Sequence, residues 1–245
     1  IAGTGAITFA TGVISAASIV QSNSNTVTFS GHNTYTGSTT VNAGTLAAGV
    51  STSGTSYGAF GVGSNITVNG GTLALGSYNE SVGTVTIGSS GGSITGSGTL
   101  TATTSYTFNN TSSATISAIL AGTGVTLTQA GAGTTTLSNT NTYSGGTTIQ
   151  TGATIAVSAA SNLGTGTVTL DGGTLSITNN SSAFTDPSTG TKTKVFVFIK
   201  IYEAIVRMVP IAERVKRIAT WRSALFAAFS LVSVKRCLCS GRPGS

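Results

Sequence analysis

The chain has 245 residues, which is long enough for one all-β domain or for a stack of repeats with a sizeable core. Only 7% of its residues are charged, against roughly 25% in an ordinary soluble domain, and 34 are glycine. All eleven Lys and Arg lie between Lys192 and Arg242, so residues 1–191 hold three acidic residues, no base and a net charge of −3. This distribution excludes a basic, nucleic-acid-binding body.

Short runs with a period of two residues predict β-strands along residues 1–178. Each run is bounded by Gly, Asn or Ser and alternates apolar residues with Thr, so that the hydroxyls share one face. The predicted strands are Thr26–Phe29, Ile66–Val68, Thr84–Ile87, Thr99–Thr101, Val125–Thr128, Thr134–Leu137 and Val168–Leu170. β-branched residues at these positions also argue against a disordered chain.

One turn occurs twice, since Asn33-Thr-Tyr-Thr-Gly37 returns as Asn141-Thr-Tyr-Ser-Gly145. Further matches keep their order, with offsets of 119 residues (Ala2–Gly5 to Ala121–Gly124), 108 (Tyr35 to Tyr143) and 102 (Gly70–Leu73 to Gly172–Leu175). The shrinking offset predicts that a first copy, at about residues 2–76, carries insertions relative to a second at 121–178. We place the insertions near Gly12–Asn23 and Ser51–Ala59, because stacked repeats accept extra residues as edge loops.

The residues that recur in both copies are predicted to be structural anchors of the repeat. Glycines within Asn69-Gly70-Gly71 and Asp171-Gly172-Gly173 supply the positive φ that tight turns require. The anchors are Asn33, Tyr35, Gly37, Gly44, Gly70, Gly71, Asn141, Tyr143, Gly145, Gly152, Gly172 and Gly173.

Short strands, frequent turns and an internal repeat favour an all-β fold, a right-handed parallel β-helix (β-solenoid) over residues 1–185. At a strand spacing of about 4.8 Å, roughly eight coils would make a rod of about 40 Å. A β-sandwich or jelly roll is the alternative, but these folds have longer strand spacing and more core aromatics than the 7% found here.

Residues 186–245 form a basic tail of different character, in which glycine disappears until Gly241 and one apolar face at helical spacing runs from Ile201 to Ala219. Three interpretations stay open: a basic amphipathic helix on an anionic membrane, a helical cap or linker, or a non-native stretch from a shifted reading frame. Cys237 and Cys239 provide too few ligands for a metal site, and we expect no metal and no cofactor.

The segment Ala121–Ile149, with its Ala-Gly-Thr-Gly start and Asn-Thr-Tyr-Ser-Gly-Gly-Thr-Thr-Ile end, resembles the autotransporter-associated β-strand repeat. That repeat belongs to passenger regions of type V secreted proteins of Gram-negative bacteria. Thr26–Leu46, Leu163–Leu175 and Gly96–Leu100 are similar to passenger repeats as well, so the resemblance covers about residues 2–178. It implies a secreted or cell-surface location and a C-terminal translocator barrel, whose pattern of alternating ten-residue strands is absent from this sequence.

Catalytic groups are scarce before residue 179. Glu80 and Asp171 are the acidic candidates for a two-carboxylate glycosidase, but we interpret Glu80 as a solvated loop residue and Asp171 as a turn residue equivalent to Asn69. His32 is predicted to be exposed in a turn, without the partners a base or ligand needs. Tyr35 and Tyr143 are predicted to pack over their turns, with contact to a glycan as the alternative.

The sequence therefore predicts a non-enzymatic passenger segment, a rigid and adhesive stalk that presents a binding region at the cell surface. Its expected partners are a host or neighbouring cell surface, a glycan or matrix, and no nucleic acid. Two alternatives stay open: a Thr-rich solenoid that binds ice or another ordered surface through a hydroxyl ladder, and a fragment of a β-helical carbohydrate-active enzyme.

Overall fold

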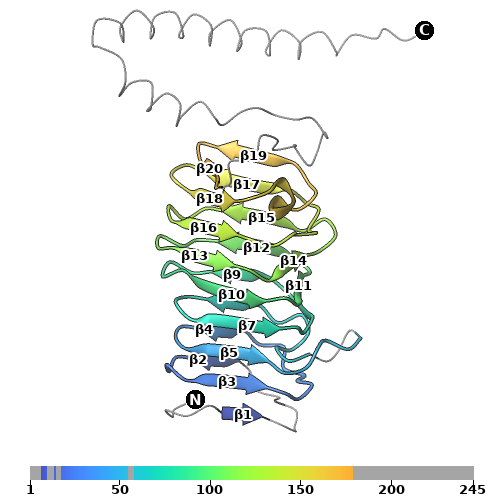
Figure 1. Cartoon of the computed structure of the whole chain (residues 1–245). Coiled ribbons are helices and arrows are strands. Elements are labelled where there is room, and N and C mark those ends of the chain that lie inside the picture. Colours follow the sequence, from blue (N-terminus) through green and yellow to red (C-terminus); the bar gives the residue numbers. More distant parts are fainter. Residues whose placement is uncertain (1–6, 10–13, 15–17, 55–57, 179–245) are drawn as a thin grey trace, which may run out of the picture. The chain divides into compact units, whose positions relative to one another are not determined.

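The computed structural model describes residues 7–9, 14, 18–54 and 58–178, which form twenty short strands and one short 3-10 helix, η1 (Ala160–Leu163) (Figure 1). The chain divides into two compact units, Ile1–Lys194 and Val195–Ser245. The predictions for the tail fall on residues 186–245, outside the described part. Within the described part, no helix is long and apolar enough to cross a membrane.

The strands belong to three sheets. Sheet 1 has nine strands in the order β1 (Ile7–Phe9), β3 (Thr26–Phe29), β5 (Thr45–Ala48), β7 (Thr72–Gly76), β10 (Gly92–Gly96), β13 (Ala114–Ile116), β16 (Thr134–Leu137), β18 (Thr154–Val157) and β20 (Thr174–Ile177). Sheet 2 has eight, in the order β2 (Ile19–Gln21), β4 (Thr39–Val41), β6 (Ile66–Val68), β9 (Val85–Ile87), β12 (Ser105–Phe108), β15 (Thr126–Gln129), β17 (Thr147–Gln150) and β19 (Val168–Asp171). Sheet 3 has three, in the order β8 (Glu80–Val82), β11 (Thr99–Ala102) and β14 (Ile119–Ala121).

The chain winds from sheet 1 to sheet 2 and back, and all neighbouring strands within these sheets are parallel, as in the pairing of Leu137 with Val157 twenty positions later. Eight such coils follow one another, and coils 4 to 6 insert a strand of sheet 3 between the other two sheets. The prediction of a parallel β-helix is confirmed, and all seven strands expected from the sequence are present.

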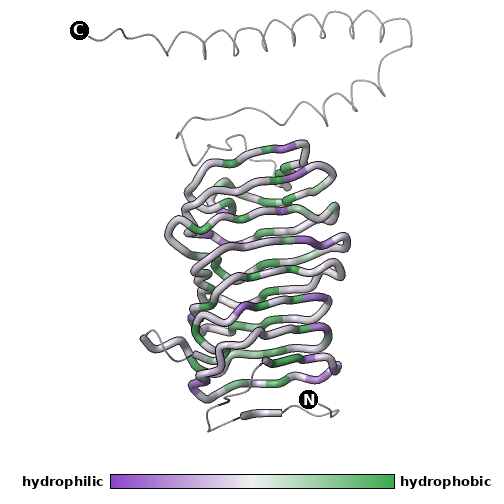
Figure 2. Tube along the Cα trace, turned by 180° about the vertical axis from the view of Figure 1, so that it is seen from behind, coloured by the Kyte–Doolittle hydropathy of each residue, from purple (hydrophilic) through white to green (hydrophobic). Residues whose placement is uncertain are grey.

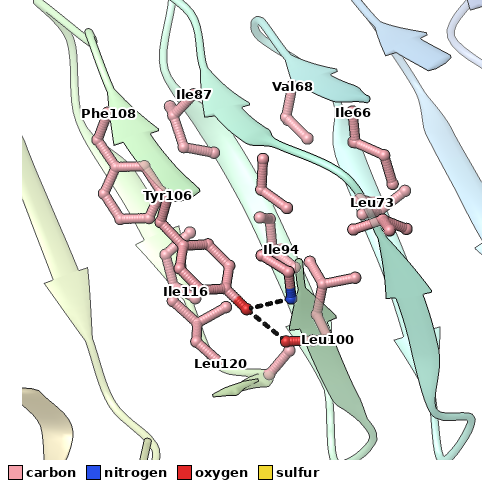
Figure 3. Close-up of a cluster of buried hydrophobic side chains, with 14 of the residues drawn as sticks. Ile66, Val68, Leu73, Ile87, Ile94, Leu100, Tyr106, Phe108, Ile116 and Leu120 are labelled. Atoms are coloured by element: carbon pink, nitrogen blue, oxygen red, sulfur yellow. Dashed lines mark hydrogen bonds between the residues drawn. The ribbon is translucent and has the colours of Figure 1, made fainter. Parts of the chain in front are cut away.

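Alternation within each strand fills the interior with stacked columns of apolar side chains. In sheet 1 one column pairs Leu46 with Leu73, Leu73 with Ile94 and Ile94 with Ile116, all of them buried. Figure 3 shows these side chains packed against Leu100 and Leu120 of sheet 3, and Figure 2 shows that apolar positions recur along successive coils. Each inward side chain is covered by its counterpart in the next coil, so the core is continuous along the stack.

The predicted insertion at Ser51–Ala59 is present, because the chain needs 27 residues from Val41 to its partner Val68 but only 19 from Val68 to Ile87. The described residues on either side of 55–57 leave the wall of the stack between β5 and β6 (Figure 1). The insertion predicted at Gly12–Asn23 is wrong, since Ile7 pairs with Val27 after an ordinary coil of 20 residues.

The error came from matching Ala2–Gly5 with Ala121–Gly124. The true counterparts are β2 and β15, where Gln21 and Gln129 keep the 108-residue offset of the Asn-Thr-Tyr turn. Both glutamines are fully buried, a feature that the strand pattern did not reveal.

The two glutamines sit in different hydrogen-bond networks. Gln129 Nε2 donates to Asn110 Oδ1 (3.1 Å) and Gly131 O (3.0 Å), and its Oε1 accepts from Thr135 Oγ1 (2.7 Å). Gln21 Nε2 donates to the carbonyl oxygens of Asn23 and Asn25, but its buried Oε1 has no partner among the described residues. The reason lies 108 residues before Thr135, where the chain has Val27. An orphaned buried acceptor lowers stability.

Val27→Thr is expected to be neutral or stabilising, because the new hydroxyl donates to Gln21 Oε1 and offsets the lost methyl group. The same change at Val68, which is also fully buried but in an apolar column, should lower the free energy of unfolding by about 1–3 kcal/mol. Urea unfolding of both variants measures the difference. Equal losses at the two positions would show that Gln21 gains nothing from a donor.

Candidate functional site

The Asn-Thr-Tyr turn forms the corner between sheets 1 and 2, and it occurs in coils 2 and 7. In coil 2 it links β3 to β4, and in coil 7 it links β16 to β17. In coils 4 to 6 the same corner is taken by the strands of sheet 3. We therefore examined this corner as the candidate site, since it is the most specific feature of the repeat.

Each motif asparagine joins three coils. Asn33 Oδ1 accepts from Ile14 N (2.9 Å) in the preceding coil, and its Nδ2 donates to Ala59 O (2.7 Å) in the following coil. Asn141 does the same with Leu120 N (2.8 Å) and Asn162 O. Both side chains are buried, so these bonds satisfy backbone groups that have no access to water.

The second asparagine also closes the edge of sheet 3. Strand β14 is the last strand of that sheet, and its Leu120 offers an N–H and a C=O to the next coil. Asn141 Oδ1 accepts from the N–H, and the backbone N–H of Thr142 donates to the C=O (2.8 Å). The corner turn thereby replaces a fourth strand and leaves no open edge at this strand.

Both motif tyrosines point into the core rather than over their turns. Tyr35 is 2% exposed and Tyr143 fully buried, which removes the possibility that their rings contact a glycan. Their hydroxyls bond to Thr39 (2.7 Å) and Thr147 (2.6 Å), inward-facing threonines of sheet 2. Burial raises the pKa of both phenols well above its usual range, so both stay neutral. Tyr143 also packs at a tilt on Tyr106, with 5.9 Å between ring centroids.

Two glycines in the following coil complete the corner, and sequence reasoning missed them. Gly61 and Gly164 both have positive φ (67° and 71°), and a Cβ at either would collide with the carbonyl oxygen and ring of the motif tyrosine below. Each follows a buried apolar residue, Phe60 or Leu163. The signal available in the sequence was the pair Phe-Gly and Leu-Gly, separated by 103 residues.

The remaining anchor glycines occupy turns. Gly37 and Gly145 precede β4 and β17 in the corner, whereas Gly44, Gly70, Gly71, Gly152, Gly172 and Gly173 lie where sheet 2 returns to sheet 1. Of these, Gly44, Gly70, Gly152 and Gly172 have positive φ. The first-copy and second-copy glycines thus lie at equivalent turns several coils apart.

The interpretation of Glu80 as a solvated loop residue is wrong. Glu80 begins β8 and is 2% exposed, because the three strands of sheet 3 point the column Glu80, Leu100 and Leu120 inward. Its Oε2 accepts from Ala59 N (3.1 Å) and Thr52 Oγ1 (3.1 Å). Burial is the main cause that raises the pKa of Glu80 to about 7, and these hydrogen bonds oppose the shift.

The other chemical candidates stay apart. Asp171 ends β19 in coil 8 and is exposed, so four coil spacings, roughly 19 Å, separate it from Glu80. Paired glycosidase carboxylates lie within about 10 Å of each other. His32 is exposed beside Asn33, as predicted. No group of three or more His, Cys, Asp or Glu side chains that could hold a metal ion occurs in the described residues.

Asn141→Ala is expected to lower the free energy of unfolding by about 2–5 kcal/mol, because it leaves a buried N–H at Leu120 and a buried C=O at Asn162 unpaired. Asn109→Ala is the control, since Asn109 is exposed in the turn after β12 and should change stability by less than about 0.5 kcal/mol. Denaturant unfolding of the two variants compares them. A change at Asn141 as small as the one at Asn109 would show that the corner does not join the coils.

Comparison with known proteins assigns the corner-bearing segments. Residues 19–48 and 127–157 match the passenger-associated-transport-repeat family. These ranges begin at β2 and β15 and end with β5 and β18, so each match spans one Asn-Thr-Tyr corner with the strands on either side. No curated protein and no solved structure matches the chain. The two matches and the parallel β-solenoid that contains them identify residues 19–48 and 127–157 as autotransporter passenger repeats, as the sequence analysis predicted.

Proposed function

We propose that this chain is a non-enzymatic stalk, a rigid part of an autotransporter passenger that holds a binding region away from the bacterial surface. The continuous core of eight coils is the observation that carries the proposal. Coils at about 4.8 Å spacing span roughly 40 Å. Passenger repeats imply a secreted or cell-surface location for this stalk.

The corner contacts support a mechanical role. The Asn-Thr-Tyr residues with the largest burial all bond within the solenoid, to Ala59 and Asn162 through the asparagines and to Thr39 and Thr147 through the tyrosines. Their side chains are committed to holding coils together and none is left to meet a ligand. Adhesion by the stalk would thus depend on its outer faces or on the region that it presents.

A display experiment tests the proposal. The chain is placed between a signal peptide and an outer-membrane translocator barrel, and surface exposure is measured with antibodies and proteinase K. The wild type and Thr115→Lys, a change on an exposed outward position of β13, should reach the surface as protease-resistant chains. Ile94→Lys puts a charge in the core column and should yield degraded passenger. Periplasmic retention of the wild type, or resistance of Ile94→Lys, would contradict the stalk.

A second candidate function is binding to ice or a similarly ordered, uncharged surface. The outward position of sheet 2 is threonine in seven successive coils, paired in register from Thr40 to Thr169. The members are Thr40, Thr67, Thr86, Thr107, Thr128, Thr148 and Thr169. Their spacing of about 4.8 Å gives a regular row of hydroxyl and methyl groups with no charge in the row.

Thermal hysteresis of the purified chain tests this candidate. If the row binds ice, Thr107→Lys at its centre should abolish hysteresis, because a long charged side chain breaks the flat row, whereas Thr115→Lys on sheet 1 should leave it unchanged. The absence of hysteresis in the wild type, or an equal loss in both variants, would rule the candidate out.

A further inference from the structure

Glu80 is a buried acid whose surroundings contain nothing to neutralise it. Residues 1–191 include no Lys or Arg, so the described solenoid has no cationic side chain to pair with the carboxylate. The titratable group that interacts with Glu80 is Tyr35, whose buried phenol stays neutral. In the next two coils, leucines occupy the position of Glu80. A charged Glu80 is therefore held in a column built for apolar side chains.

The carboxyl group instead bonds to both described ends of the insertion in coil 3. Its Oε2 accepts from Thr52 Oγ1 on one side and from Ala59 N on the other, both at 3.1 Å. Thr52 Oγ1 also accepts from Ser81 N (2.9 Å), the residue after Glu80. Its second oxygen, Oε1, is buried and has no hydrogen-bond partner among the described residues. Protonation would remove the charge from this oxygen while Oε2 keeps its two bonds.

We propose that Glu80 is a proton-dependent latch, which fastens the coil 3 insertion to β8 when the carboxyl group is protonated and loosens it when the group is charged. The insertion also covers the free edge of sheet 3, since Thr52 N donates to Asn79 O (2.7 Å) and Ser51 Oγ accepts from Asn79 N (3.0 Å). Loosening the latch would expose the edge strand β8. The described insertion residues would thus become accessible to a partner on the alkaline side of neutrality.

The direction of the pH effect follows from burial. Burial raises the pKa of Glu80 to about 7, so the closed form binds more protons than an open form with an ordinary carboxyl group. The free energy that holds the latch is complete in mild acid, declines as the pH rises above about 4.5, and reaches its lower limit once the pH exceeds the folded pKa near 7.

Amide hydrogen exchange of the full chain between pH 5.5 and 8.5 tests the latch, with each rate divided by the intrinsic exchange rate at that pH. Protection of the Ala59 and Ser81 amides should fall by about tenfold or more across this range. The Thr147 amide, which bonds to Thr167 O in coil 8, serves as the internal reference and should change little.

Two substitutions separate the charge from the contacts. Glu80→Gln keeps an acceptor for Ala59 N–H and should make protection independent of pH, at the level of the wild type in mild acid. Glu80→Leu matches Leu100 and Leu120 and should preserve folding, but should leave Ala59 weakly protected at every pH. Constant protection in the wild type, or a fall with pH that persists in Glu80→Gln, would overturn the latch.

Discussion

Parallel stacking of coils in register is the constraint on which the rest of the structure depends. A single coil of about twenty residues cannot enclose its own apolar side chains, so each inward residue is covered by its partner one coil away. The pairing of Leu46, Leu73, Ile94 and Ile116 in one column shows this directly. Because register fixes which side chain covers which, a polar residue in a column must find its partner within its own or an adjacent coil.

The buried polar residues follow from that constraint. Thr39 and Thr147 stand in an otherwise largely apolar inward column of sheet 2, and each is matched by the hydroxyl of a corner tyrosine. Gln129 is matched by Thr135, whereas Gln21 is only half matched because Val27 stands in that place. Glu80 is the exception among the acids, and its contacts with the coil 3 insertion explain how a carboxyl group is accommodated there. Tolerance of these groups depends on local partners rather than on the fold as a whole.

The corner explains why the passenger repeat carries its motif. Asparagine is suited to join coils because its side chain offers one acceptor and one donor group in a plane, like a peptide unit. Asn33 and Asn141 use both, upward and downward along the stack. The motif therefore occurs where sheet 3 is missing and takes over its bonding. This architectural use of the motif is consistent with a stalk, whose requirement is continuity from coil to coil.

The sequence by itself determined the fold class, the seven strands with clear alternation and the position of one insertion, because side-chain periodicity and repeated turns are local properties. It did not determine the register between coils. A local four-residue likeness, Ala2–Gly5, was mistaken for a repeat boundary, and only pairing across coils corrected it. Strands such as β8 and β14 have three residues, too few for a visible period. Whether Glu80 and the corner tyrosines faced water or the core was decided by the neighbouring coils, since burial here is created by residues some twenty positions away.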